Sequence, residues 1–250
     1  MAEDVAKRRA DGLDEEAIAK AHAIYTPSML SIYDLLVHVV SNHLAWRCPT
    51  RKLLDLYRAN LSANHLEAGV GTGYLLDRAG RPSFQRLVLL DINRNCLARA
   101  KRRLARFEPE LREANLLAPL RLDLTPFSSV GLTYVLHCLP GRMSDKLIAL
   151  DHLRTLMEKR AVLFGAIILG RGIQPNWAAR TLLDVYNDKG VFNNRNNDLQ
   201  SLTDGLRERF DEVQVGMQGC VALFRASSAA WPLTRRSLCE VSFRFTANPR

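Results

Sequence analysis

The sequence predicts an α/β fold: a doubly wound, mostly parallel sheet of seven strands with helices on both faces and an N-terminal helical cap. Apolar runs of strand length alternate with amphipathic helical segments between about residues 60 and 226. The run AVLFGAIILG at 161–170 is apolar throughout, as strands buried on both faces are. The glycine-rich stretch LEAGVGTG at 66–73 follows the first predicted strand, at the edge where such sheets bind ligands.

The composition fits one large domain with an appended cap. The chain has 250 residues, of which 47% are hydrophobic and 24% are charged. Its five cysteines show no CxxC spacing, so we expect neither a disulfide framework nor a metal site. The N-terminus lacks the apolar core of a secretion signal, and the longest apolar run is about half of what a membrane helix needs. These features predict a cytoplasmic protein with no membrane partner.

The net charge of +9 permits a nucleic-acid partner without favouring one. Lysines and arginines are spread along the chain, and their densest cluster, AKRRLAR at 100–106, lies inside a helical pattern. We interpret this cluster as the solvated face of a helix. The charge alone therefore does not predict nucleic-acid binding.

The N-terminal half predicts a helical region followed by a β-α-β unit. Residues 31–46, SIYDLLVHVVSNHLAW, have apolar side chains at helical spacing, and the helical region extends to about residue 60. A strand at 65–69 is followed by the glycines, a short helix at 74–80 and the apolar strand RLVLLDI at 86–92. The next helix, at 93–107, has Asn93 or Asn95 as its N-cap.

The C-terminal half continues the alternation. The third strand is predicted at 117–124, LAPLRLDL, and the fourth at 130–139, VGLTYVLHCL. Later come a helix at 144–157, the strand at 161–170, a helix at 198–210, and strands at 211–218 and 220–226 that a short turn makes antiparallel. We therefore expect a cap over 1–60, a cofactor-binding sheet domain over 61–226 and a tail at 227–250 without an assigned role.

The spacing of the glycines discriminates between cofactors. Gly69, Gly71 and Gly73 let the backbone turn sharply and approach a ligand without interference from a Cβ atom. A dinucleotide fingerprint reads GxGxxG, whereas here the third glycine comes one residue early and Tyr74 stands at the expected position. The pattern therefore disfavours a nicotinamide dinucleotide.

Two acids at strand ends point to a nucleoside cofactor. Asp91 ends the second predicted strand, where a carboxylate accepts hydrogen bonds from ribose hydroxyls. Asp123 ends the third predicted strand, where a carboxylate can accept from an adenine amino group. Together with the glycines, these acids form a more specific signal than any one of them does alone.

These residues resemble the class I S-adenosylmethionine-dependent methyltransferases. The resemblance rests on LEAGVGTG, LLDIN, LDL and the strand end VLHCLPG, and covers roughly residues 60 to 226. An uncharacterised branch of small-molecule methyltransferases near specialised metabolism is further resembled by the segments SIYDLLVHVVSNHLAWRCPT, HLEAGVGTGYLLD, HCLPG, VLFGAIILG and NWAARTLLDVYNDKGVFNN. One departure is Glu67, where many relatives carry aspartate; it lengthens the reach by one methylene and keeps the charge.

The resemblance implies that S-adenosylmethionine is the cofactor and S-adenosylhomocysteine the product. It also implies which residues hold the cofactor. Glu67 would fix the glycine loop or the amino group of the cofactor, and the three glycines would line its methionine and ribose parts. Asp91 would hold the ribose hydroxyls. The remaining implied contacts are Ile92 and Leu124 on the two faces of the adenine, Asp123 on its amino group, and Leu136 and His137 beside the sulfonium.

The resemblance also implies methyl transfer to a small organic acceptor at an oxygen, nitrogen or carbon atom. Because the sulfonium already activates the methyl group, positioning the acceptor can supply most of the acceleration of an in-line displacement. A general base is needed only for a weakly acidic acceptor, and His137 is the candidate, although the backbone often serves at this position. The catalytic residues and the oligomeric state stay open.

The acceptor pocket is expected between the cap and the segment after the fifth strand. Aromatic side chains can exclude water there, and a cationic side chain can pair with a carboxylate. The loop 186–198, rich in asparagine and glycine, is interpreted as closing over the site. The candidate pocket residues are Tyr25, Tyr33, Trp46, Arg47, Asn176, Trp177 and Tyr186, each of which core packing would explain equally well.

Two alternative functions remain from the sequence. The same cofactor domain could methylate RNA or protein, which the basic balance permits, and a steep loss of RNA affinity with salt would favour it. A non-catalytic nucleoside-cofactor-binding protein of doubly wound fold is the other alternative. Cys48 and Cys138 lack the placement of nucleophilic cysteines in base-methylating enzymes, and we interpret them as buried structural thiols.

Overall fold

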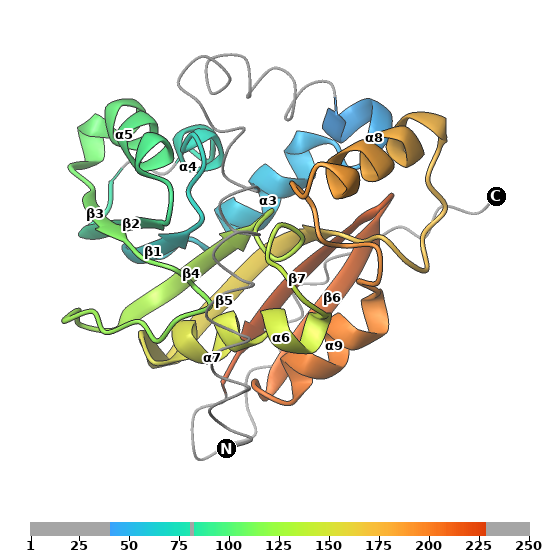
Figure 1. Ribbon diagram of the computed structural model, residues 1–250. Helices are drawn as coiled ribbons and strands as arrows, with labels where there is room; N and C mark the ends of the chain where they lie inside the picture. The colour runs from blue at the N-terminus through green and yellow to red at the C-terminus, as the bar shows by residue number, and fades with distance from the viewer. Residues whose placement is uncertain (1–40, 81–82, 229–250) are drawn as a thin grey trace, which may run out of the picture.

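The protein forms a single seven-stranded sheet in the order β3-β2-β1-β4-β5-β7-β6 (Figure 1). The structure is a computed structural model and describes residues 41–80 and 83–228. The pairs β1·β2, β1·β4, β2·β3 and β4·β5 are parallel, and β7 lies antiparallel between β5 and β6. The strands are β1 (Asn64–Ala68), β2 (Arg86–Asp91), β3 (Glu110–Glu113), β4 (Phe127–Thr133), β5 (Met157–Ile168), β6 (Glu212–Gln218) and β7 (Val221–Ser227). The predicted doubly wound, mostly parallel sheet of seven strands is confirmed, whereas most of the predicted N-terminal cap lies outside the described residues.

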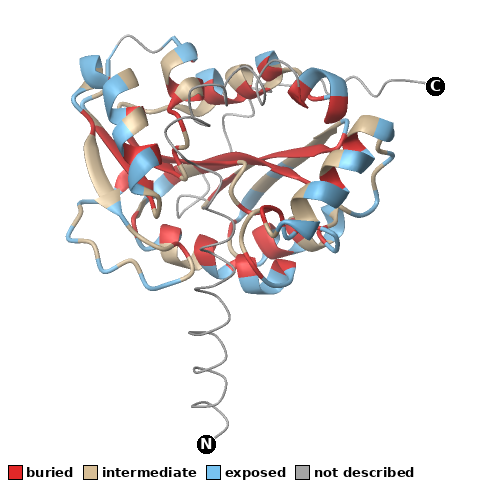
Figure 2. Ribbon diagram, turned by 45° about the horizontal axis from the view of Figure 1, so that its top comes forward, coloured by how far each residue is buried: buried red, intermediate tan, exposed pale blue. Residues whose placement is uncertain are grey.

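Helices cover both faces of the sheet (Figures 1 and 2). Figure 2 shows the sheet as a buried central layer, with exposed residues on the outer sides of the helices. One face carries α3 (Thr50–Asn60), α4 (Tyr74–Arg78), α5 (Arg94–Arg103), a short 3-10 helix (Ala105–Phe107) and α8 (Trp177–Asp188). The other face carries α6 (Met143–Lys146), α7 (Ile148–Arg154) and α9 (Leu199–Arg207). Each face has its own hydrophobic core.

Asparagine or aspartate side chains cap the N-termini of three of the helices that border the sheet, α5, α8 and α9. Of the two predicted N-caps of α5, Asn93 holds the position, and its side chain accepts a hydrogen bond from the Asn95 amide at 2.9 Å. Asn176 caps α8 and Asp198 caps α9 in the same way. The helix predicted at 31–46 lies almost entirely outside the described residues.

The prediction of the third strand was wrong. The sheet uses Glu110–Glu113, and no strand occurs between residues 114 and 126. Because β3 is an edge strand of four residues that pairs with β2 alone, its sequence ELRE needs no apolar alternation. Three of the four leucines of LAPLRLDL, Leu120, Leu122 and Leu124, contact the second core as partly buried residues of an irregular segment, which explains the apolar pattern.

The fourth strand is shorter than predicted. It ends at Thr133 because the next residue, Tyr134, has a positive φ of 62°, which is incompatible with a continuing strand. Leu136 and His137 therefore lie in the turn after β4. The antiparallel pair β6 and β7, by contrast, is confirmed near its predicted bounds.

A buried lysine connects this turn to the loop after α8. Lys146 is fully buried, and its Nζ donates to the Asn193 carbonyl at 2.5 Å and to Asn197 Oδ1 at 3.3 Å. The Asn193 amide in turn donates to the His137 carbonyl at 2.7 Å. The middle of the loop predicted to close over the site is thus anchored to α6 and to the turn after β4.

Because Lys146 is buried, we expect the free energy of unfolding of the protein to rise with pH. Burial lowers the pKa of its amine from 10.5 to about 8, so between these values the unfolded chain binds a proton that the folded chain has released. We expect the free energy of unfolding to rise by about 1 kcal/mol per pH unit above pH 8 relative to Lys146→Met. Urea denaturation of both proteins at pH 7.5, 8.5 and 9.5 measures the difference, and parallel pH profiles would contradict the assignment.

Candidate functional site

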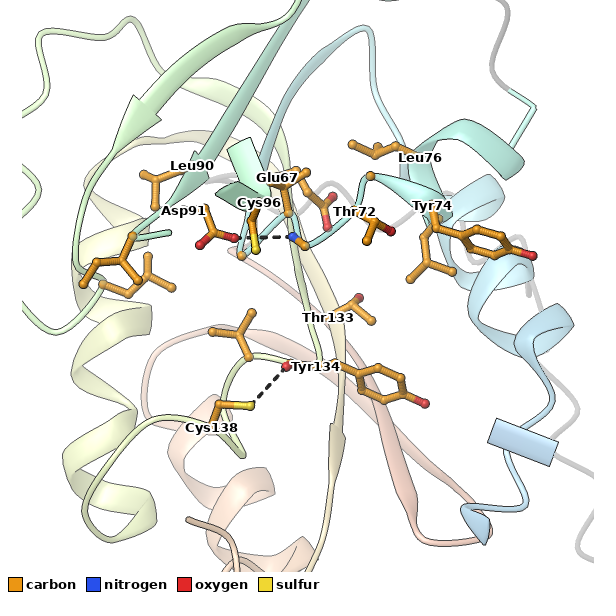
Figure 3. Close-up of a pocket in the computed structure, with 18 of the residues that line it drawn as sticks. Glu67, Thr72, Tyr74, Leu76, Leu90, Asp91, Cys96, Thr133, Tyr134 and Cys138 are labelled. Atoms are coloured by element: carbon orange, nitrogen blue, oxygen red, sulfur yellow. Dashed lines mark hydrogen bonds between the residues drawn. The ribbon is translucent and has the colours of Figure 1, made fainter. Parts of the chain in front are cut away.

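A pocket opens at the carboxyl ends of β1, β2 and β4 (Figure 3). This is the edge at which doubly wound sheets bind ligands, beside the point where the strand order reverses from β1 to β4. The described lining comprises residues 69–76 after β1, 90–92 at the end of β2, 114–116 after β3, and 133–135 and 138–140 after β4, together with Tyr57 of α3, Glu67 of β1 and Cys96 of α5.

The glycine loop has the backbone that the sequence predicted. All three glycines have positive φ, which side chains disfavour. A Cβ on Gly69 would lie 2.2 Å from Cγ2 of Val135, so this glycine also permits close packing against the turn after β4. A Cβ on Gly71 would meet nothing within 4 Å. Gly71 therefore presents bare backbone to open space in the pocket.

Asp91 ends β2 and points into the pocket (Figure 3). Its side chain is buried and accepts hydrogen bonds from the amide of Asn93 at 2.9 Å and from the amide of Gly71 at 3.4 Å. Burial raises its pKa from 3.8 to about 6, although these backbone amides oppose the shift. Backbone amides thus fix both carboxylate oxygens of Asp91 at the end of β2, where a ligand can donate hydrogen bonds to them.

Glu67 is enclosed by Tyr57 of α3 and by His65 of its own strand, β1. Its Oε1 accepts a hydrogen bond from the Tyr57 hydroxyl at 2.5 Å, and its Oε2 lies 3.0 Å from Nε2 of His65. His65 in turn contacts the Ser129 hydroxyl through Nδ1 at 2.8 Å. All four residues are buried, so the network joins α3, β1 and β4 beneath the pocket.

Gly131 of β4 makes room for this carboxylate. It is the register partner of Glu67 on the neighbouring strand, and a Cβ there would lie 2.3 Å from Glu67 Oε2. A glycine inside a buried strand is unfavourable unless another group approaches closely. The carboxylate is that group.

The pocket is acidic although the chain is basic. Two carboxylates, Glu67 and Asp91, contribute to the described lining, and no described lining residue is Lys, Arg or His. The rest of the lining is apolar or carries hydroxyl, amide or thiol groups. Such a pocket suits a ligand that combines cationic groups with hydroxyls and a flat apolar part.

The structure brings six of the ten predicted cofactor residues together. Glu67, Gly69, Gly71, Gly73, Asp91 and Ile92 line the pocket. Asp123 and Leu124 do not, because the third strand was misplaced: Asp123 is exposed and Leu124 packs on the second core. Ala114, Asn115 and Leu116, which follow the true third strand, occupy the corresponding part of the pocket.

Leu136 and His137 point away from the pocket. Leu136 is buried in the second core, and the His137 ring packs against Phe192 at a centroid distance of 4.4 Å. Its Nδ1 accepts a hydrogen bond from the Ile168 amide at 3.4 Å. Burial lowers the pKa of His137 to about 3, so the imidazole is neutral and a poor proton acceptor.

The residues predicted to wall the acceptor pocket do not line the cavity. Trp46 is buried against Phe192, and Arg47 is exposed, with its carbonyl bound to Gln218. Asn176 is the cap of α8, Trp177 is 82% exposed, and Tyr186 packs on Phe192. Tyr25 and Tyr33 lie outside the described residues.

Sequence reasoning missed the three tyrosines of the described pocket lining, Tyr57, Tyr74 and Tyr134. Tyr57 lies in the segment that the sequence assigned to the helical cap, and no site role was predicted for it. The available signal was that a buried tyrosine on a helix face needs a hydrogen-bond partner for its hydroxyl. Tyr134 has a left-handed backbone, and its hydroxyl donates to Asn42 Oδ1 at 3.0 Å. Strained non-glycine residues of this kind concentrate at functional sites, but no local sequence signal marks them.

Comparisons with known proteins show the family of the chain. The family model described as a methyltransferase domain matches residues 66–163. Demethylluteothin O-methyltransferase of Streptomyces thioluteus is 38% identical over 217 residues, which cover 86% of this chain and 94% of that protein. The chain belongs to the S-adenosylmethionine-dependent methyltransferases. The methyltransferase is also 35% identical to the physcion biosynthesis cluster O-methyltransferase of Aspergillus chevalieri, over 82% of this chain and 93% of that protein.

A solved structure shares the fold of the methyltransferase. The N-methyltransferase NodS from Bradyrhizobium japonicum WM9, in complex with S-adenosylhomocysteine, superimposes with a TM-score of 0.54 at 17% identity, over 72% of this chain and 88% of that one. Within residues 41–80 and 83–228, no helix has the length and apolar character needed to cross a membrane.

The pocket fits the cofactor of the family, S-adenosylmethionine, which supplies a methyl group activated by a positively charged sulfur. The fit rests on the acidic lining, on the bare backbone at Gly71 and on the fixed oxygens of Asp91. The methyltransferase therefore uses S-adenosylmethionine as its methyl donor.

The pKa of Asp91 predicts that cofactor affinity depends on pH. Ribose hydroxyls donate to the ionised carboxylate, and below about pH 6 the cofactor-free protein holds a proton there instead. We expect the Kd for S-adenosylhomocysteine to rise roughly tenfold between pH 7.5 and 5, since binding then requires the loss of a proton with a pKa near 6. Isothermal titration calorimetry at the two pH values measures the change.

Asp91→Asn should bind more weakly and lose this pH dependence, whereas Asp123→Asn should behave like the wild type. The matched pair separates the carboxylate in the pocket from the exposed one that the sequence suggested. An unchanged pH profile in Asp91→Asn, or weakened binding in Asp123→Asn, would show that the carboxylate has been misassigned.

Proposed function

We propose that the methyltransferase transfers the methyl group to a hydroxyl oxygen of a small, flat organic acceptor. The main support is that two relatives of high coverage, described above, are named O-methyltransferases. The pocket adds support: Figure 3 shows the rings of Tyr74 and Tyr134 extending to the same side of it. Aromatic rings so placed can contact a flat acceptor and exclude water from it.

The proposed roles of the cofactor-binding residues follow from their positions. Asp91 holds the ribose hydroxyls, and Ile92 with Leu116 contacts the adenine from the ends of neighbouring strands. Asn115 takes the place that Asp123 was expected to fill, with an amide that can both donate and accept. Gly71 leaves space for the cofactor beside the loop.

Catalysis in this proposal depends on positioning. The described lining has two titratable carboxylates but no imidazole or amine, and His137 faces the core. An in-line displacement at an activated methyl group gains most of its rate from holding the two reactants at attack distance and in line. A phenolic or enolic hydroxyl, which loses its proton readily, suits such a site better than an alkyl alcohol does.

The proposal places the enzyme in the cytoplasm, without a nucleic-acid partner. Cys48, Cys96, Cys138 and Cys220 are free thiols, three of them buried, as is usual in a reducing compartment. Several arginines of the described chain pair with neighbouring carboxylates, among them Arg86, Arg106 and Arg209. Part of the positive charge is therefore engaged within the protein.

Gly71→Arg should abolish cofactor binding, because the new side chain enters the open space of the pocket at a residue with φ of +54°. Gly172→Arg is the matched control: Gly172 also has positive φ and open space around a Cβ, but it is exposed and outside the pocket. We expect at least a hundredfold weaker titration with S-adenosylmethionine for Gly71→Arg and wild-type affinity for Gly172→Arg. Equal loss in both variants would mean that backbone strain, and not occupation of the pocket, is responsible.

The acceptor is identified by incubating the protein and S-adenosylmethionine with a panel of phenols, enols, amines and alkyl alcohols. Mass spectrometry of the products, with fragmentation to place the methyl group, distinguishes the atoms. We expect methyl ethers of phenols or enols. Methylation at nitrogen or carbon alone, or turnover only with RNA or protein, would contradict the proposed acceptor while leaving the cofactor assignment intact.

A further inference from the structure

Tyr57 brings a polar group from α3 into the cofactor pocket. Its ring is buried and packs edge-on against Phe164 of β5 at a centroid distance of 5.0 Å. The ring is therefore fixed by the core, while the hydroxyl reaches the pocket lining beside Glu67. The hydroxyl is positioned by packing and does not depend on a flexible side chain.

The hydrogen bond to Glu67 fixes the direction of the phenol proton. A phenol has one proton, and Tyr57 donates it to Glu67 Oε1 at 2.5 Å. Burial, and next the negative charge of Glu67, raise the pKa of Tyr57 well above 10, so the proton stays on the phenol. The Tyr57 oxygen can then interact with a ligand only as an acceptor.

The Thr133 hydroxyl is a second polar group at the same place. It is buried at the end of β4 and lines the pocket, and Figure 3 shows it facing the same space as Glu67. The Thr133 hydroxyl lies close enough to the Tyr57 phenol to lower the pKa of the phenol. The Thr133 oxygen nevertheless makes no hydrogen bond of good geometry within the described part of the chain. A buried hydroxyl in this state calls for a partner from a ligand.

Glu67 itself is held from behind. His65 and Gly131 fix the carboxylate on the side opposite Tyr57, so it cannot swing freely into the pocket. Its negative charge lies behind the two hydroxyl oxygens and polarises them. The Tyr57 and Thr133 oxygens, with Glu67 behind them, form a site that can accept hydrogen bonds from a cation. The glycine loop lies between this site and Asp91 in the pocket.

We propose that the oxygens of Tyr57 and Thr133 accept hydrogen bonds from the ammonium group of the cofactor's methionine part, with Glu67 as the charge behind them. The inference rests on the assignment of S-adenosylmethionine to this pocket. Asp91 binds the ribose, and the methionine part extends from the opposite side of the sulfur, so the ammonium reaches the Glu67 end. Glu67 is thus a positioning residue that acts through Tyr57, in place of the direct contact with the amino group that was one of the two roles implied by the family resemblance.

The test compares two ligands that differ only at this end. S-Adenosylhomocysteine carries the ammonium, whereas 5′-methylthioadenosine has the same adenosine without the amino-acid part. Tyr57→Phe removes the hydroxyl and keeps the ring that packs on Phe164. Calorimetric titration should show at least tenfold weaker binding of S-adenosylhomocysteine and unchanged binding of 5′-methylthioadenosine, because one hydrogen bond to a charged group is lost.

Two further variants complete the experiment. Tyr186→Phe removes a hydroxyl from a half-buried tyrosine outside the pocket and should bind both ligands like the wild type. Thr133→Val removes the second proposed acceptor at nearly constant volume and should show the same selective loss as Tyr57→Phe, so the test stands even if one variant does not fold.

Three outcomes would overturn a claim, and they are distinguishable. Unchanged binding of S-adenosylhomocysteine in both variants would remove the ammonium site. Equal loss for both ligands would give the hydroxyls a structural role alone. Failure of the wild type to bind S-adenosylhomocysteine would overturn the cofactor assignment itself, on which this inference depends.

Discussion

The site depends on one buried carboxylate, Glu67, in the middle of the sheet. An isolated carboxylate in such a place would be strongly unfavourable, so the chain surrounds it with Tyr57, with His65 and with the space left by Gly131. These partners come from α3, β1 and β4, and the same contacts that neutralise the cost of burial join the three elements. The pocket lies directly against this network, so its acidic character is a consequence of how the core is built.

The second acid shows how folding stability and binding oppose each other. Ionised Asp91 is less stable in the folded chain than in water, by about 3 kcal/mol at neutral pH given a pKa near 6. Because folding raises the pKa of Asp91, its protonated form contributes to the free energy of unfolding. This contribution is fully present below about pH 4 and is lost as the pH rises through 6. A cofactor that donates hydroxyls to the carboxylate compensates for this loss. The basic chain thus keeps an acidic pocket that its cationic cofactor stabilises.

Sequence reasoning recovered the features that local pattern encodes. The apolar runs identified six of the seven strands, and the spacing LEAGVGTG identified the loop whose glycines all have positive φ. It failed at β3, since a short polar edge strand carries no apolar signal and the leucines after it mimic one. It also missed Tyr57 and Tyr134, because their roles arise from contacts over long sequence distances and from a backbone conformation that the neighbouring residues do not predict.

We infer that the cofactor lies between Asp91 and the Tyr57–Glu67 pair. A crystal structure of the protein with S-adenosylhomocysteine would show this placement. We expect the ribose hydroxyls on Asp91, the adenine beside Ile92 and Leu116, and the amino nitrogen within hydrogen-bond distance of the Tyr57 oxygen. Density for the ligand with its amino group turned away from Tyr57, or with its ribose distant from Asp91, would rule out this placement.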